Sequence, residues 1–306
     1  MAFLGALPAR FRRERVLIVG CGDVGQRAAR ELGGDRRVRL MALTSSAHSA
    51  ATLRAQGITP LTGDLDRPAT LQRLAGVASR VLHLAPPPSE GPADWRLDPR
   101  TRVLMQVLAR RSPPRALVYG STTGVYGDCE GRWVDEVTLP RPQTPRALRR
   151  VDAEAAVHRL GRVSGVRTTV LRIPGIYASD RPGGTPVERL RRGTPVLRAD
   201  DDVYTNHIHA DDLARACVLA LWRGRPQRNL NVVDETQLKM GDYFDLAADL
   251  YGLPRPPRVA RDAAGDQLPL VLLSFMSESR RLHNRRMKQE LRLRLRYPTV
   301  TEGLRP

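Results

Sequence analysis

Residues 16–25 read VLIVGCGDVG, and they constrain the fold more than any other stretch. The apolar, mostly β-branched run predicts a buried strand, and the following RAARELGG favours a helix. The glycines keep G-x-G-x-x-G spacing: the first allows a tight turn, the second lets the backbone approach a pyrophosphate, and the third lets the helix pack on the strand. An ordinary loop is the alternative for a lone glycine pattern. Because a strand precedes this one and a helix follows it, we predict a dinucleotide site at Gly20, Cys21, Gly22, Asp23, Val24 and Gly25.

Strand and helix patterns then alternate along the first half of the chain. Strands are expected at 38–43, 58–61, 80–85 and 116–119, and helices at 51–56, 69–76 and 101–110. This alternation predicts an α/β fold, a Rossmann doubly wound parallel sheet with a smaller C-terminal substrate lobe. We expect three parts: a basic N-terminal extension (1–15), the dinucleotide-binding domain (16–175), and a mixed lobe (176–306) whose returning segments complete the sheet.

The ends of the predicted strands indicate which cofactor fits. An NAD site usually has an acidic residue after the second strand, whereas this chain has Thr44, Ser45 and Ser46. Three hydroxyls without a carboxylate favour NADP, with NAD as the alternative. Asp64 and Leu65 follow the third strand, where they could touch the adenine, although Asp64 could also cap the helix at 69–76. Ala85 and Pro86 open a proline loop at the cofactor edge after the fourth strand.

The net charge of +18 raises the question of a nucleic-acid partner. The positive residues are almost all arginines scattered along the chain, and aromatic residues make up only 5%. We therefore expect no specific nucleic-acid binding. No apolar run approaches the roughly 20 residues that cross a bilayer, and the apolar start is too short for a secretory signal, so we expect a cytoplasmic protein without a membrane contact. Cys21, Cys129 and Cys217 have no metal or disulfide spacing, and no metal is expected.

Several ordered motifs beyond the glycine turn share one pattern. They are YGSTTGVYGD with WVDE soon after, TVLRIPGIYASDR, NHIHADDLARA and NLNVVDE. Together they closely resemble the extended and atypical short-chain dehydrogenase/reductase family, in its NAD-dependent epimerase/dehydratase branch. The resemblance implies a loop over the nicotinamide after Ile173. It also implies a substrate-orienting hydroxyl at Thr122, with Ser121 beside it.

The same family carries its chemistry on a tyrosine and a lysine in Y-x-x-x-K. In the matching frame this chain has Arg146 and Arg150 instead. An arginine stays protonated, so Arg146 cannot cycle a proton as a phenol does. Arg150 can still bind ribose hydroxyls or phosphates through its fork of donors. Tyr126 and Tyr177 are the candidate substitutes for the missing acid, and packing as half-buried aromatic residues is the alternative for both.

The later chain is expected to hold the substrate. Four arginines could bind an anionic small molecule, or lie on a solvated helix face: Arg189, Arg191, Arg192 and Arg198. The resemblance makes His209 structural, tying its loop to Asp211 and Asp212, since a metal at His207 and His209 would need further ligands. The sequence thus predicts an NAD(P)-dependent oxidoreductase or epimerase/dehydratase-like enzyme that lacks the Tyr-x-x-x-Lys pair. The alternative is a catalytically inactive dinucleotide-binding sensor, and a homodimer is possible in either case.

Overall fold

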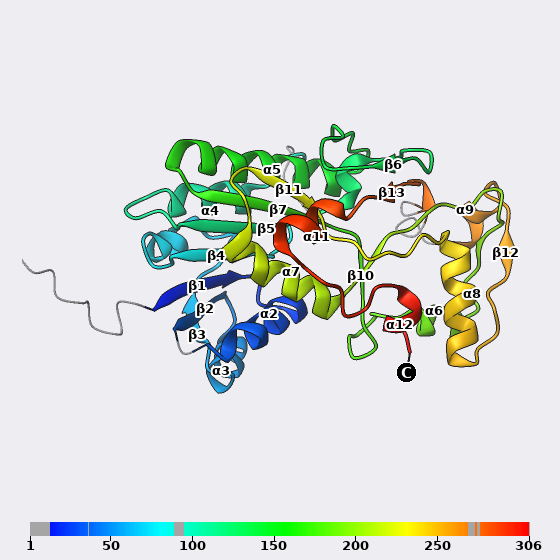
Figure 1. Cartoon of the computed structure of the whole chain (residues 1–306), viewed down its shortest axis with the longest axis horizontal. Helices are drawn as coiled ribbons and strands as arrows, with labels where there is room; N and C mark the ends of the chain where they lie inside the picture. The colour runs from blue at the N-terminus through cyan, green and yellow to red at the C-terminus, as the bar shows by residue number, and fades with distance from the viewer. Residues whose placement is uncertain (1–12, 36, 89–94, 269–272, 274–275, 306) are drawn as a thin grey trace, which may run out of the picture.

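The structure is a computed structural model, and it describes residues 13–35, 37–88, 95–268, 273 and 276–305 (Figure 1). A seven-stranded sheet with the order β11-β7-β5-β4-β1-β2-β3 forms its centre. Every neighbouring pair of strands in it is parallel. The strands are β1 (Glu14–Val19), β2 (Val38–Thr44), β3 (Thr59–Thr62), β4 (Arg80–His83), β5 (Ala116–Thr122), β7 (Arg167–Ile173) and β11 (Arg228–Asn231). The strand order reverses direction between β1 and β4, which confirms the doubly wound Rossmann class.

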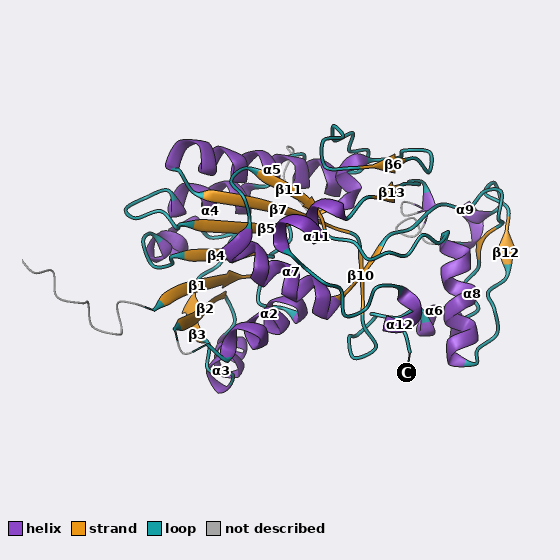
Figure 2. Ribbon diagram, in the orientation of Figure 1, coloured by secondary structure: helices purple, strands orange, loops and turns teal. Residues whose placement is uncertain are grey.

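Helices cover both faces of this sheet (Figure 2). Successive residues of β1 alternate between two apolar clusters: Val16 and Ile18 belong to one, Leu17 and Val19 to the other. The first cluster includes α2 (Asp23–Gly33), α3 (Ala47–Ala55), α7 (Ala210–Arg223) and α11 (Arg285–Leu291). The second includes the 3₁₀ helix η1 (Pro68–Leu74), α4 (Pro99–Leu108) and α5 (Pro145–Ser164). The continuous apolar strands of the sequence are therefore buried on both sides.

A smaller lobe lies beyond one end of the sheet, where Figure 1 shows α8, α9 and β12 gathered away from β1 to β3. It has its own apolar cluster, built around Phe244 and Leu197. Its elements are β8 (Gly175–Tyr177), α6 (Val187–Arg191), β9 (Val196–Leu197), β10 (His207–His209), α8 (Met240–Tyr251), β12 (Arg258–Val259), α9 (Ala264–Gln267) and α12 (Val300–Gly303). Two short strands, β6 (Trp133–Val134) and β13 (Arg281–Leu282), pair beside it.

Several boundaries differ from the sequence prediction. β1 begins at Glu14 because Glu14 and Arg15 pair with β2, so these two residues belong to the sheet and not to the predicted extension. Residues 1–12 of that extension lie outside the described residues. β5 continues to Thr122 because its last residues pair with β7. The segment predicted as a helix at 69–76 is the 3₁₀ helix η1. Its N-cap is Arg67 and not Asp64, so the capping alternative for Asp64 was wrong.

Candidate functional site

The predicted site residues gather at the carboxyl ends of the parallel strands. Gly20 follows β1, Thr44 ends β2, Asp64 follows β3, and Thr122 ends β5. Ile173 ends β7 and lies directly opposite Thr122 in the strand register. We call this side of the sheet the carboxyl edge. Ligands of doubly wound sheets bind at this edge, beside the point where the strand order reverses.

The glycine turn lies at that reversal point. Gly20 has a positive φ of 89°, and a Cβ there would lie 2.3 Å from the backbone nitrogen of Ala85. A Cβ on Gly25 would lie 2.8 Å from the carbonyl oxygen of Gly20, so this glycine brings α2 close to β1. A Cβ on Gly22, the N-cap of α2, would meet no atom within 4 Å. Two glycines are thus required by packing, whereas the third leaves open space in front of the helix amides.

The residues between these glycines have distinct environments. Burial raises the pKa of the Cys21 thiol to about 11, so this thiol stays protonated at neutral pH. Val24 packs partly buried on the apolar cluster of α2 and α7. Asp23 begins α2, and its carboxylate faces Arg27 and Arg181.

The residues predicted to hold the adenosine part lie at the ends of β2 and β3. Ser46 is the N-cap of α3, and its Oγ accepts a hydrogen bond from the backbone nitrogen of Ser49 at 3.3 Å. Thr44 and Ser45 precede it, and Ser45 is exposed. The Oδ1 of Asp64 accepts from the nitrogen of Asp66 at 3.0 Å, while Leu65 packs against the second apolar cluster. On the other side of the turn, Ala85 donates to Val19 and Pro86 accepts from Arg100.

A buried polar network runs behind the end of β5. The Oγ of Ser121 donates to Glu154 over 2.6 Å, and the guanidinium of Arg172 holds the same carboxylate with an Nη2 to Oε2 distance of 2.8 Å. Arg172 is only 2% exposed and lies over the ring of Tyr126. The hydroxyl of Tyr126 donates to Asn231 over 2.7 Å. Ser121 and Tyr126 are therefore engaged within the fold, whereas Thr122 is only partly buried, and its hydroxyl accepts from the nitrogen of Gly124.

The two arginines at the family's Tyr and Lys positions begin the long helix α5. Arg146 lies in its first turn and is exposed. The Nη1 of Arg150, one turn later, donates to the carbonyl oxygen of Gly120 and to the hydroxyl of Tyr119. Its Nε is buried and makes no hydrogen bond to any described residue. Arg150 thus keeps one unsatisfied donor beside the end of β5.

The remaining candidates have structural roles in or beside the second lobe. Tyr177 is 1% exposed, its hydroxyl donates to Thr299, and burial raises its pKa well above the usual value. The Nδ1 of His209 accepts from the nitrogen of Asp211 and caps α7. Burial lowers the pKa of His207 to about 3, so this ring is neutral at physiological pH. Among the described residues, no group of His, Cys, Asp and Glu could hold a metal ion.

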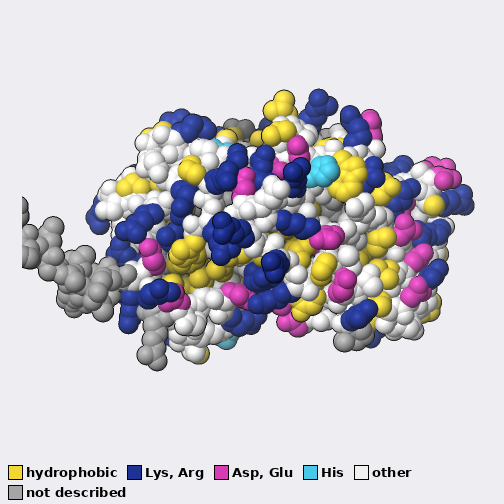
Figure 3. All heavy atoms as spheres, viewed as in Figure 1, with side chains coloured by type: hydrophobic (Ala, Val, Ile, Leu, Met, Phe, Trp, Pro, Cys, Tyr) yellow, Lys and Arg dark blue, Asp and Glu magenta, His cyan; other side chains and the backbone are white. Residues whose placement is uncertain are grey.

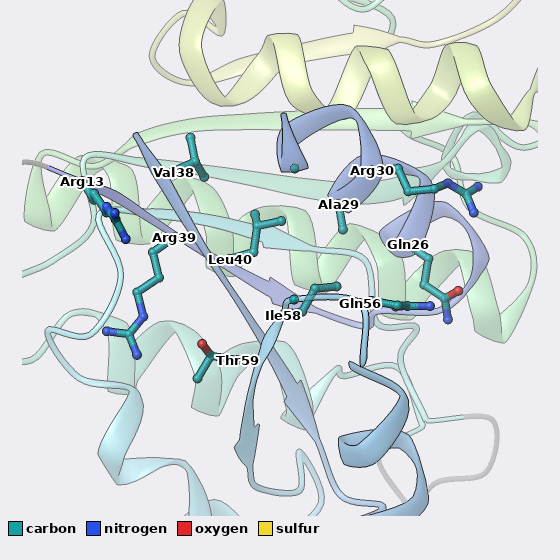
Figure 4. Close-up of a pocket in the computed structure, with 12 residues that line it drawn as sticks. Arg13, Gln26, Ala29, Arg30, Val38, Arg39, Leu40, Gln56, Ile58 and Thr59 are labelled. Atoms are coloured by element: carbon teal, nitrogen blue, oxygen red, sulfur yellow. The ribbon is translucent and has the colours of Figure 1, made fainter. Parts of the chain in front are cut away.

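A surface cavity of about 670 Å³ lies elsewhere (Figure 4). Its middle is apolar, with Ala29, Leu40 and Ile58, and arginines such as Arg30 and Arg39 surround it. It shares no residue with the predicted site. Over the visible face of the molecule, lysine and arginine side chains are spread out with Asp and Glu between them (Figure 3), rather than gathered in one track.

Two charged clusters at the site were missed by the sequence reading. One is the pair of Glu154 and Arg172, and the other is Arg27 with its partners Asp180 and Asp211. A charged residue inside an apolar strand, such as Arg172 in TVLRI, was the available signal for the first. Nothing in the local sequence of Arg27 indicates its distant partners.

Comparison with known proteins agrees with this architecture. A family model described as the NAD dependent epimerase/dehydratase family matches residues 16–232. A functionally unknown conserved protein from Silicibacter pomeroyi is 30% identical, with 95% of this chain and 96% of that chain covered and a TM-score of 0.77. No curated protein matches the chain significantly.

Two more distant structures share the fold. The UDP-glucuronic acid 4-epimerase from Bacillus cereus, in complex with NAD, is 16% identical with a TM-score of 0.75. The UDP-glucose 4-epimerase from Thermotoga maritima, with UDP-glucose, is 18% identical with a TM-score of 0.75. In both cases 95% of this chain and 96% of the other are covered. In the described part of the chain, no helix is both long and apolar enough to cross a membrane. Because the family model spans most of the chain and includes all of the doubly wound sheet except the first two residues of β1, this protein belongs to the NAD dependent epimerase/dehydratase family.

Proposed function

We propose that this protein binds a pyridine dinucleotide across its glycine turn and is an oxidoreductase or epimerase/dehydratase-like enzyme for an anionic small molecule. The geometry of the three glycines carries the proposal. Gly20 and Gly25 bring β1, β4 and α2 together, and the space in front of Gly22 is open. The amides at the start of α2 can therefore receive a diphosphate.

The proposed dinucleotide site extends along the carboxyl edge. Residues 20–25 hold the pyrophosphate, Asp64 and Leu65 lie beside the adenine, and Ala85 and Pro86 border the glycine turn. Ile173 lies at the nicotinamide end. Arg150 is only partly buried, and its guanidinium lies beside the end of β5, which supports a contact of this arginine with a ribose hydroxyl.

The choice between NADP and NAD depends on the end of β2. No carboxylate stands at Thr44, Ser45 or Ser46 to repel a 2′-phosphate. The Oγ of Ser46 accepts a backbone hydrogen bond, which leaves its own hydrogen for donation, and it lies at the positive end of α3. These features support NADP as the preferred cofactor, whereas the family description and the B. cereus complex point to NAD.

The proposed chemistry uses the hydroxyl of Thr122, a residue that is only partly buried. A bound nicotinamide would supply a hydride acceptor or donor, and Thr122 would orient the substrate oxygen near it. Arg146 is exposed one helical turn before Arg150, so the two cations support an anionic substrate, such as the nucleotide sugars named for the related structures. Tyr126 and Tyr177 have buried hydroxyls that make hydrogen bonds within the fold, which favours a structural role for both.

A homodimer stays a prediction, and sedimentation velocity measures the oligomeric state.

Titration of the purified protein with NADPH and NADH, followed by nucleotide fluorescence, tests the binding. We expect NADPH to bind more tightly; tighter NADH binding would overturn the cofactor preference alone. The Gly22→Val variant should abolish binding of both while keeping the melting temperature. Hydride transfer is then assayed with nucleotide sugars, aldehydes and ketones, where Thr122→Ala should lose activity and Thr122→Ser should retain it.

A second candidate function is a dinucleotide sensor without turnover. The observation that favours it is the exposed Arg146 at the family's tyrosine position, because arginine is no proton donor at physiological pH. Tight dinucleotide binding without hydride transfer across the substrate panel would establish this function over the first.

A further inference from the structure

Arg27 joins the glycine-turn helix to the second lobe. This side chain lies in the second turn of α2 and is only 5% exposed. It contacts three carboxylates: Asp23 at 3.0 Å, Asp180 at 2.6 Å and Asp211 at 2.5 Å. These three carboxylates neutralise the positive charge of Arg27. Arg27 is therefore not available to bind an anionic ligand at the start of α2.

A second arginine stands on the solvent side of the same cluster. The Nε of Arg181 lies 3.3 Å from the Oδ2 of Asp23, and its Nη1 donates to the carbonyl oxygen of Ile176 over 2.8 Å. Two backbone hydrogen bonds close its loop. The nitrogen of Ala178 donates to the carbonyl oxygen of Gly184, and the nitrogen of Gly184 donates to that of Arg181. The side chain is 28% exposed, so it is fixed in place and still reachable from solvent.

The local charge balance is unfavourable for a diphosphate without Arg181. Three carboxylates face two arginines at the start of α2, and one of these arginines is buried. Burial lowers the pKa of the nearby His209, so its ring adds no positive charge at neutral pH. The buried Oδ2 of Asp23 makes no hydrogen bond to any described residue, so Asp23 holds Arg181 by charge alone.

We propose that Arg181 is a dinucleotide-binding residue, which reaches from the second lobe to the pyrophosphate at the amides of α2 and offsets the carboxylate of Asp23. This inference rests on the proposed function, since it adds a residue to the same site. It also gives a structural reason for the Arg27 cluster. By holding Asp180, Arg27 fixes the residue that precedes Arg181, and thereby fixes the distance between the second lobe and the glycine turn.

The test compares four proteins by NADPH and NADH titration at low and high salt: the parent protein, Arg181→Ala, Arg181→Lys and Arg255→Ala. Arg255 pairs with Asp249 in an exposed ion pair of the second lobe, so its variant removes the same charge and the same kind of contact elsewhere. We expect Arg181→Ala to lower the affinity for both nucleotides roughly ten- to hundredfold. The affinity of this variant should also depend less on salt than that of the parent protein. The affinity of Arg181→Lys should lie between those of the parent and of Arg181→Ala, and Arg255→Ala should bind as tightly as the parent.

The outcomes separate this inference from the proposed function. If the parent binds, Gly22→Val does not, and Arg181→Ala binds as the parent does, the role of Arg181 is refuted while the dinucleotide site stands. If the parent binds neither nucleotide, the proposed function fails and the role of Arg181 fails with it. Thermal melting of each variant shows whether a loss of affinity reflects unfolding, and the Arg181→Lys protein supplies the decisive titration if the alanine variant does not fold.

Discussion

The Nη1 of Arg150 donates a hydrogen bond to the carbonyl oxygen of Gly120 over 2.6 Å. Gly120 lies in β5, two residues before Thr122, so this bond ties the first turns of α5 to the strand that carries the candidate substrate-orienting hydroxyl. The same nitrogen lies 3.1 Å from the hydroxyl of fully buried Tyr119. Arg150 is thus a structural link as well as a candidate ribose contact, at the position where the resemblance leads us to expect a lysine.

Replacing Arg150 should therefore affect stability and binding together. Arg150→Met keeps much of the side-chain length but leaves two acceptors without their charged donor, so we expect a loss of about 1–3 kcal/mol in the free energy of unfolding. Urea denaturation measures it, and a nucleotide titration on the folded variant measures the ribose contact. An unchanged unfolding free energy would contradict the structural link, and unchanged affinity would remove Arg150 from the cofactor site.

The glycines of the turn should respond in opposite ways. Gly20→Ala places a Cβ 2.3 Å from the nitrogen of Ala85 at a positive φ, so we expect a large loss of stability. Gly22→Val meets no protein atom within 4 Å of its Cβ, so the fold should survive while the diphosphate is excluded. Thermal melting with and without NADPH distinguishes the two. A Gly22→Val protein that NADPH still stabilises as strongly as the parent would show that the nucleotide does not use this turn.

The sheet followed from the sequence because its strands are apolar runs bounded by turn residues, and both apolar faces are needed in a doubly wound fold. The conformation of the glycine turn could be predicted because its glycines carry a steric requirement that the structure displays at Gly20 and Gly25. That a dinucleotide binds at this turn stays a prediction. Strand ends were harder to predict. β5 extends to Thr122 through its pairing with β7, and this pairing depends on residues some fifty positions later in the chain.

The charged clusters could not be predicted for a related reason. The partners of Arg27 at Asp180 and Asp211 are 153 and 184 residues away, and only the folded chain brings them together. An arginine on an amphipathic helix is typical of a solvated face. The burial of Arg27 instead depends on the loop that carries Asp180 and on α7, whose first turn carries Asp211. The catalytic hydroxyl, the cofactor preference and the role of Arg150 stay predictions, since they concern contacts with molecules outside the chain.

The ion pair of Glu154 and Arg172 should be essential for stability. Both side chains are buried, and Glu154→Gln would leave the Arg172 guanidinium without its counter-charge, at a cost of about 3–5 kcal/mol. Ser121→Ala removes only one hydrogen bond to the same carboxylate and should cost less, about 1.5–3 kcal/mol, because the acceptor is charged. Urea denaturation of both variants checks the contrast. If Ser121→Ala instead abolished hydride transfer in a folded protein, Ser121 would have the catalytic role that its burial argues against.

Asp234 should make stability depend on pH. Its carboxyl is 4% exposed, its Oδ1 accepts from the nitrogen of Thr236, and burial raises its pKa to about 7. The folded protein therefore holds this proton more tightly than the unfolded chain, in which the pKa of an aspartate is about 3.9. The resulting stability is fully present below about pH 4 and is lost as the pH rises through about 7.

Urea denaturation of the parent and of Asp234→Asn between pH 5 and pH 8.5 measures this effect. The asparagine keeps an acceptor for Thr236 but cannot ionise. We expect the parent to lose stability relative to the variant by up to about 1.4 kcal/mol per pH unit as the pH rises toward 7, and the difference to level off above that. His83 and His207, whose pKa burial lowers to about 3, have the opposite dependence, but they are present in both proteins and cancel in the difference. A difference that is constant across this range would show that Asp234 is already ionised in the fold at pH 5.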